Sequence, residues 1–279
     1  MKKLIFLLCF ISFSAFAVGQ LTTVQNGVKL YSEYYPNSTS KFKGTIVFIN
    51  GSGTSMGEWG QNKKFFRCAK KAGSLFLYDR SGLGGSPQDT KLSEKHPITA
   101  KLISDQLSIL LQKQKIKLPY IIVAHSYGSI YAGYFVLTHP SLVKSVLMVD
   151  PVPRNFQFSN ALMDNIKSGI KYAMNHDETA VYKKYPADTE EIYQMLGFSE
   201  SKNELKKFGL INDSIPVVII SSTAMEYKVK PIIGDWFNQQ KQWLNKNLNS
   251  KIFQVKSGHF IQIHRPNIVC KQIEKLVSD

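Results

Sequence analysis

Two patterns of hydrophobic and polar positions alternate along the chain from about residue 44 onward. Short, nearly continuous apolar runs predict buried strands at Thr45–Asn50, Ser74–Asp79, Tyr120–His125, Val143–Asp150, Pro216–Ser221 and Lys251–Lys256. Amphipathic segments, with apolar residues three and four positions apart, predict the intervening helices at Glu58–Gly73, Ile98–Gln114, Ser129–Pro140, Asp235–Asn249 and Pro266–Val277. This alternation predicts the α/β class, with a mostly parallel, doubly wound sheet.

Two segments depart from this alternation. Upstream of it, Gly27–Tyr35 has a looser apolar and polar alternation, which predicts an antiparallel edge strand. Between Asp150 and Pro216 the pattern contains helical candidates and no strand. We therefore expect a core in two parts, residues 18–150 and 216–279, with residues 151–215 inserted between them as a helical cap.

The first 17 residues have the pattern of a secretory signal peptide. Lys2 and Lys3 precede an apolar run from Leu4 to Phe13, and a small-x-small sequence ends at Ala17. The apolar run is shorter than the roughly 20 residues that a membrane-spanning helix needs. The sequence predicts cleavage after Ala17 and export, to the periplasm or out of the cell.

Charge and cysteine content narrow the range of partners. The formal net charge is +15, but the basic residues are scattered and accompany no nucleic-acid-binding motif. This distribution predicts a solvated basic surface, compatible with weak attraction to an anionic membrane, and no specific nucleic-acid partner. Beyond the signal peptide only Cys68 and Cys270 remain, too few for a structural zinc site without histidines at ligand spacing. We expect no metal or organic cofactor, and the sequence does not specify an oligomeric state.

The candidate chemistry begins with the segment Ala124-His125-Ser126-Tyr127-Gly128. It fits a small-x-Ser-x-Gly pattern and lies between a predicted strand and a predicted helix, the setting of a nucleophile elbow. Small residues at both ends allow the close approach of strand and helix that such a turn imposes. Ser126 would then be displayed at a helix N-terminus, where the backbone N–H of Tyr127 can bind an oxyanion.

Four blocks of residues, each following a predicted strand, together resemble the α/β-hydrolase superfamily over roughly Gly27 to Val277. The blocks are Asn50–Gly53, Tyr78–Ser86, Ala124–Gly128 and Ser257–Gln262. The resemblance implies the α/β-hydrolase fold, with a cap between strands 6 and 7 of that fold. It also implies that the Ser52 backbone supplies a second oxyanion N–H, although Asn50 stands where the family usually has histidine.

A serine nucleophile needs a base and an acid. His259 follows Gly258 after the last predicted strand, in the block where the family carries its catalytic histidine. The family usually places the acid after the strand that follows the cap, where this chain has no aspartate but has Glu226. Some members place it at the end of the preceding strand, where this chain has Asp150. We favour Asp150 as the acid, with Glu226 as the alternative.

These residues predict an exported serine hydrolase that cleaves a carboxylic ester or related acyl bond of a small-molecule substrate through an acyl-enzyme. Peptide, lactone or C–C bond cleavage by the same residues is an alternative, since the fold does not determine the leaving group. A non-catalytic binding protein with this fold is another, because no aspartate occupies the usual acid position.

The resemblance also bears on the two remaining cysteines. In the fold that the chain resembles, the helices that carry Cys68 and Cys270 pack side by side on one face of the sheet. An exported protein reaches an oxidising compartment, so we predict a disulfide between them. Two separate buried thiols are the alternative.

Overall fold

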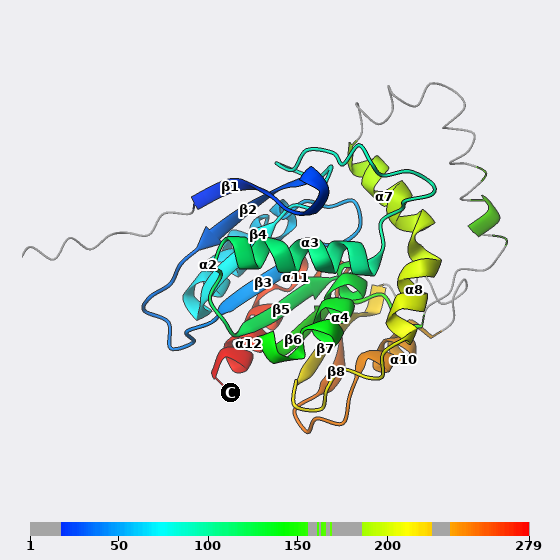
Figure 1. The fold of residues 1–279 in the computed structure, drawn as a ribbon. Helices are drawn as coiled ribbons and strands as arrows, with labels where there is room; N and C mark the ends of the chain where they lie inside the picture. The colour runs from blue at the N-terminus through cyan, green and yellow to red at the C-terminus, as the bar shows by residue number, and fades with distance from the viewer. Residues whose placement is uncertain are drawn as a thin grey trace, which may run out of the picture.

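An eight-stranded sheet forms the centre of the molecule (Figure 1). The computed structural model describes residues 18–155, 161, 163–165, 168, 186–224 and 235–278 of the 279-residue chain. The strand order is β1-β2-β4-β3-β5-β6-β7-β8. The strands are β1 (Val18–Thr23), β2 (Lys29–Tyr35), β3 (Thr45–Ile49), β4 (Ser74–Tyr78), β5 (Tyr120–His125), β6 (Val143–Val149), β7 (Val217–Ser222) and β8 (Lys251–Val255).

Strands β3 to β8 are parallel to one another, as their continuous apolar runs predict. Strand β2 is antiparallel to β4, as predicted, but it is not an edge strand. Its other side pairs with β1, also antiparallel, in the register Val18 to Tyr34 and Thr23 to Lys29. The edge prediction was wrong because β1 follows directly after the signal-peptide pattern and has little apolar character of its own.

Helices cover both faces of the sheet, and each face has its own hydrophobic core. On one face lie α3 (Ala100–Lys113), α4 (Gly128–Thr138) and α8 (Phe198–Lys206), which bury side chains such as Ile103, Ile130 and Leu205. On the other face lie α1 (Gly57–Gly60), α2 (Lys63–Ala72), α11 (Ile261–His264) and α12 (Pro266–Ser278). The predicted α/β-hydrolase architecture is confirmed.

Two predicted helices differ from the structure. The segment Glu58–Gly73 contains two helices. The second, α2, begins anew because the Asn62 side chain accepts hydrogen bonds from the N–H groups of Lys64 and Phe65 and so caps its N-terminus. The helix predicted over Asp235–Asn249 ends early, as α10 (Trp236–Gln240) and a 3₁₀ turn at Lys241–Trp243. Beyond the turn, asparagine side chains bond to the backbone of other loops, which competes with helix formation.

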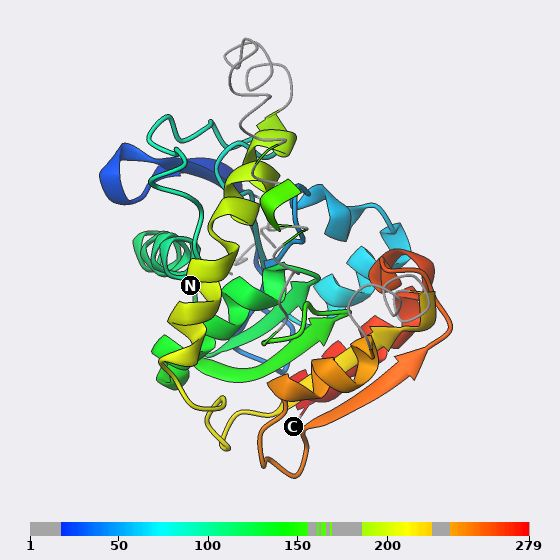
Figure 2. The ribbon, with the colours of Figure 1, turned by 90° about the vertical axis from the view of Figure 1, so that its right-hand side faces the viewer.

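The segment between β6 and β7 contributes α7 (Pro186–Leu196) and α8, and its described residues 161, 163–165 and 168 are also helical. Its described residues form no strand. In Figure 2 both helices lie in front of the sheet, on the side of α3 and α4. Among the residues that the structure describes, no helix is long and apolar enough to cross a membrane.

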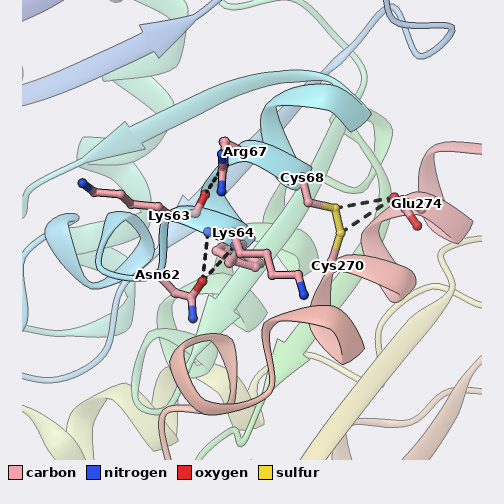
Figure 3. The surroundings of a disulfide bond; sticks show 8 residues. Asn62, Lys63, Lys64, Arg67, Cys68, Cys270 and Glu274 are labelled. Atoms are coloured by element: carbon pink, nitrogen blue, oxygen red, sulfur yellow. Dashed lines mark hydrogen bonds between the residues drawn. A yellow bond between two sulfur atoms is a disulfide. The ribbon is translucent and has the colours of Figure 1, made fainter.

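Cys68 of α2 and Cys270 of α12 are joined by a disulfide (Figure 3). Their Cα atoms lie 6.2 Å apart, within the usual range for a disulfide. The bond connects positions 202 residues apart and links two helices that pack side by side. The Glu274 carboxylate lies near both sulfur atoms. These three side chains are the only described group of acids, cysteines and histidines spaced to hold a metal ion, and their two sulfurs are bonded to each other.

Candidate active site

Ser126 occupies a sharp turn between β5 and α4. Its backbone φ is +51°, a left-handed conformation that residues other than glycine adopt rarely. At Gly128, an added Cβ would lie 2.7 Å from the backbone oxygens of Ile49 and Asn50, so the turn requires glycine there. The Ser126 N–H donates to the Val149 carbonyl at 3.0 Å, which ties the turn to β6. The side chain remains partly exposed, as a nucleophile must be.

His259 and Asp150 form a direct hydrogen bond. The His259 Nδ1 atom lies 2.7 Å from Asp150 Oδ2. Asp150 follows β6, is fully buried and also has a positive φ, +46°. Because the carboxylate can only accept, it holds the His259 proton on Nδ1 and leaves Nε2 as the unprotonated nitrogen of a neutral ring.

Four further hydrogen bonds hold the Asp150 carboxylate. Its Oδ2 accepts the Ser222 hydroxyl at 2.6 Å, and its Oδ1 accepts the Ser222 N–H at 3.0 Å. The Trp236 indole and the Gln240 amide also donate to Oδ1, at 3.3 and 3.2 Å. Burial would raise the pKa of Asp150, but the bond to His259, its charge and the Ser222 donors together lower it. The group is therefore ionised at neutral pH.

Of the two candidate acids, the structure places Asp150 against His259. Glu226 lies outside the described residues.

No hydrogen bond joins Ser126 to His259 within the described part of the chain. The His259 ring lies instead beside that of His125, with centroids 4.7 Å apart. Hydrogen bonds between a nucleophile and its base are often long in unliganded enzymes.

His125 is buried at the end of β5, directly before Ser126. The sequence assigned it no role. Its Nδ1 lies 3.3 Å from Glu58 Oε2 and its Nε2 lies 3.3 Å from the His259 carbonyl oxygen. Both neighbours accept hydrogen bonds, so both ring nitrogens carry protons when both bonds form. Burial lowers the pKa of His125, but the charge and hydrogen bond of Glu58 outweigh it and raise the pKa overall. This buried ion pair holds the backbone of His259.

Two backbone N–H groups remain available beside Ser126. Those of Ser52 and Tyr127 donate to no acceptor among the described residues. Tyr127 is the N-cap residue of α4. At Gly51, an added Cβ would lie 3.3 Å from the Ser126 Cβ, which places the loop that carries Ser52 against the serine. The two predicted oxyanion donors therefore lie on segments that adjoin the nucleophile.

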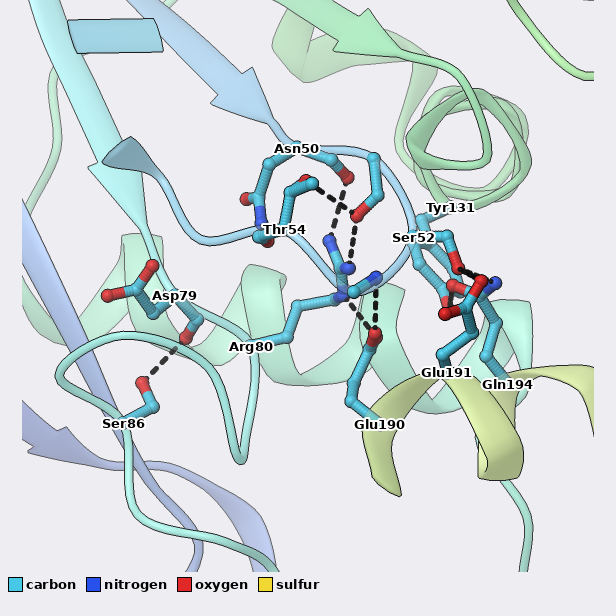
Figure 4. A network of polar contacts seen from close by, with 12 residues as sticks. Asn50, Ser52, Thr54, Asp79, Arg80, Ser86, Tyr131, Glu190, Glu191 and Gln194 are labelled. Carbon is cyan, nitrogen blue, oxygen red and sulfur yellow. Dashed lines mark hydrogen bonds and ion pairs between the residues drawn. The ribbon is translucent and has the colours of Figure 1, made fainter. Parts of the chain in front are cut away.

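The Tyr78–Ser86 loop contacts the Asn50–Gly53 loop, which carries Ser52, and holds it in place (Figure 4). The buried Asp79 carboxylate accepts the N–H groups of Met56 at 2.7 Å and Gly85 at 2.9 Å. Arg80 donates to the Asn50 carbonyl at 2.8 Å and to the Gly51 carbonyl at 2.6 Å. Asp79 and Arg80 thus organise their own loop and the adjoining Asn50–Gly53 loop.

Several side chains that complete the site had no sequence signal of their own. They are Glu58, Glu190, Ser222, Trp236 and Gln240. Trp236 and Gln240 are four positions apart and therefore lie on one face of a helix, but that spacing does not identify Asp150 as their target. Glu58 lies in the predicted helical segment Glu58–Gly73 and Glu190 in the predicted cap, and neither was a candidate site residue.

Comparisons with known proteins agree with the fold. The alpha/beta hydrolase family model matches residues 46–198, which is more than half of the chain. The uncharacterized protein YqjL of Bacillus subtilis is 26% identical over 230 residues, which cover 81% of this chain and 80% of YqjL.

Solved structures share the fold at low sequence identity. Cfl2 from Burkholderia cenocepacia has a TM-score of 0.68 at 17% identity, covering 93% of this chain and 95% of that one. A thermophilic esterase from Thermogutta terrifontis has a TM-score of 0.63 at 14% identity, covering 95% and 98%. The haloalkane dehalogenase DatA from Agrobacterium tumefaciens has a TM-score of 0.67 at 14% identity, covering 94% and 96%. By its fold, its motifs and the family match, the chain belongs to the alpha/beta hydrolase family.

Proposed function

We propose that this protein is an exported serine hydrolase that cleaves a carboxylic ester or a related acyl bond. The observation that carries the proposal is the buried Asp150 carboxylate bonded to His259 Nδ1 at 2.7 Å, next to a serine held at positive φ. Families with this arrangement use it to activate a hydroxyl, whose proton must be removed before it can attack. Export rests on the signal-peptide pattern, and the disulfide is consistent with an oxidising compartment.

The proposed mechanism has two half-reactions. Ser126 Oγ attacks the carbonyl carbon while His259 Nε2 takes the hydroxyl proton, and Asp150 stabilises the resulting imidazolium. The N–H groups of Ser52 and Tyr127 bind the oxyanion of the tetrahedral intermediate. His259 then gives its proton to the leaving alcohol, and the acyl-enzyme forms. Water, deprotonated by His259, attacks the acyl-enzyme. The carboxylic acid then leaves, and His259 returns the proton to Ser126 Oγ, which restores both residues.

The residues named here do not distinguish an ester from a peptide, lactone or C–C bond, because the leaving group is bound elsewhere. We propose an acyl ester first, because an alkoxide is a better leaving group than the nitrogen of a peptide bond or the carbon of a C–C bond. The alternative of a non-catalytic binding protein rested on the lack of an aspartate at the usual position after β7, and the bond between Asp150 and His259 weakens that argument.

The test is hydrolysis of p-nitrophenyl esters of increasing acyl length, together with labelling by a fluorophosphonate probe. We expect turnover and labelling in the wild type. Ser126→Ala should lose both, with a fall in kcat of several orders of magnitude, while circular dichroism shows an unchanged fold. Labelling of Ser126 without ester turnover would favour another acyl substrate. Folded wild-type protein that neither labels nor turns over would support the binding protein.

A further inference from the structure

The position of Ser52 depends on contacts from outside its own loop. Its N–H belongs to the same planar peptide unit as the Gly51 carbonyl, and the two groups point in opposite directions. Arg80 donates to the Gly51 carbonyl at 2.6 Å and to the preceding carbonyl of Asn50 at 2.8 Å. A guanidinium that holds these two oxygens fixes the plane of the Gly51–Ser52 peptide. It therefore also fixes the direction of the N–H that would bind the oxyanion.

Arg80 is in turn held by helix α7. Its side chain is almost fully buried, and its Nε donates to Glu190 Oε1 at 2.7 Å. The Glu190 side chain is fully buried as well. The Tyr131 ring lies 5.2 Å from the guanidinium carbon and covers its other side. Burial opposes the charge of Arg80, but the Glu190 carboxylate more than compensates and raises the pKa of Arg80. A buried cation without this partner would be strongly unfavourable.

Helix α7 also contacts the oxyanion loop directly. The second oxygen of Glu190, Oε2, accepts the Gly53 N–H at 3.0 Å. The Gln194 amide donates to the Ser52 hydroxyl at 2.6 Å, and that hydroxyl lies 3.3 Å from Glu191 Oε1. In Figure 4 the three α7 side chains point toward the loop from one helix. Glu190 thus contacts the loop on both sides of Ser52. It accepts the Gly53 N–H directly, and it holds Arg80, which donates to the Gly51 carbonyl.

We propose that Glu190 is a positioning residue that couples the segment inserted between β6 and β7 to the oxyanion hole. Its carboxylate orients Arg80 and the Gly53 N–H together, and so keeps the Ser52 N–H directed at the carbonyl under attack. Helix α7 thereby contributes to stabilising the transition state. This inference rests on the proposed hydrolase function, since it assigns a role within the same site.

Glu190→Gln is the principal test. The amide has one acceptor where the carboxylate has two, so it cannot accept from both Arg80 and Gly53. We expect kcat for p-nitrophenyl butyrate to fall about 10- to 100-fold, the range for a misplaced oxyanion donor, with KM changed less than about twofold. The inhibition constant of phenylboronic acid, which forms a tetrahedral adduct on serine, should rise in parallel with the loss in kcat/KM. A merely structural role would not produce that correlation.

Two further variants keep the test decisive. Glu190→Asp retains the charge that Arg80 needs but shortens the side chain, so it should fold and still show lowered kcat with weaker boronate inhibition. Glu200→Gln, on the exposed surface of α8, is the matched control and should match the wild type. If the folded Glu190 variants keep wild-type kcat and boronate affinity, the coupling is wrong. If the wild type itself does not hydrolyse esters, the proposed function fails instead, and the two outcomes are distinct.

Discussion

Replacing Asp150 by asparagine should disable the base without unfolding the protein, and the structure indicates why. The two carboxylate oxygens face different sets of donors. Oδ1 receives the Ser222 N–H, the Trp236 indole and the Gln240 amide, whereas Oδ2 receives the Ser222 hydroxyl and His259 Nδ1. The backbone N–H and the indole can only donate. The hydroxyl can accept instead, and the imidazole can change tautomer.

The asparagine amide should therefore adopt one orientation. With its NH₂ group toward Ser222 N and Trp236, two buried donors would be left unpaired, at about 1–3 kcal/mol each. The NH₂ group should instead face His259, whose Nδ1 must then accept. The ring proton moves to Nε2, the atom that has to take the proton of Ser126. By analogy with serine proteases, this tautomer lowers kcat by a factor on the order of 10⁴, which corresponds to about 5.4 kcal/mol of transition-state stabilisation.

The assay is steady-state hydrolysis of p-nitrophenyl butyrate by wild type and Asp150→Asn, with circular dichroism and thermal melting as folding controls. Glu226→Gln is the comparison, because it changes the alternative acid in the same way. We expect Asp150→Asn to lose about four orders of magnitude in kcat and Glu226→Gln to stay close to wild type. A folded Asp150→Asn with kcat within about tenfold of wild type would refute the tautomer argument. The reverse ranking of the two variants would assign the acid to Glu226.

Two further predictions concern stability. The pKa of His125 is raised in the folded state. Its ion pair with Glu58 therefore contributes its full share of the free energy of unfolding below the unfolded pKa of about 6.5, and this contribution is lost as the pH rises through the folded pKa. Glu58→Gln should therefore reduce the free energy of unfolding, measured in urea, more at pH 5.5 than at pH 9, and an equal loss at both would contradict the ion pair. Replacing Cys68 and Cys270 together by serine should lower the free energy of unfolding by up to roughly 5 kcal/mol, the value of the chain-entropy model for a loop of this length. A reductant should lower the melting temperature of the wild type but not that of the double variant.

The sequence alone predicted the order of strands and helices and the nucleophile turn. Both follow from local rules, because a buried parallel strand needs a continuous apolar run and a tight elbow needs small residues around its serine. Ser126 and His259 were identified because each lies in a short block directly after a strand. Two predictions of secondary structure were wrong, for different reasons. The edge strand β1 has little apolar pattern, and asparagines ended the helix predicted over Asp235–Asn249 through contacts with distant loops.

The tertiary structure decided which side chains meet, since contacts between distant positions leave no periodic pattern in a single sequence. Asp150 is the clearest case: the sequence offered it as one of two candidate acids, and the fold places it against His259 with donors from β7 and α10 around it. Neither Glu58 nor Glu190 was a candidate from the sequence, and packing buries each beside a basic side chain, His125 and Arg80 respectively. A buried charge requires a partner with matching geometry, and only the folded chain can supply one.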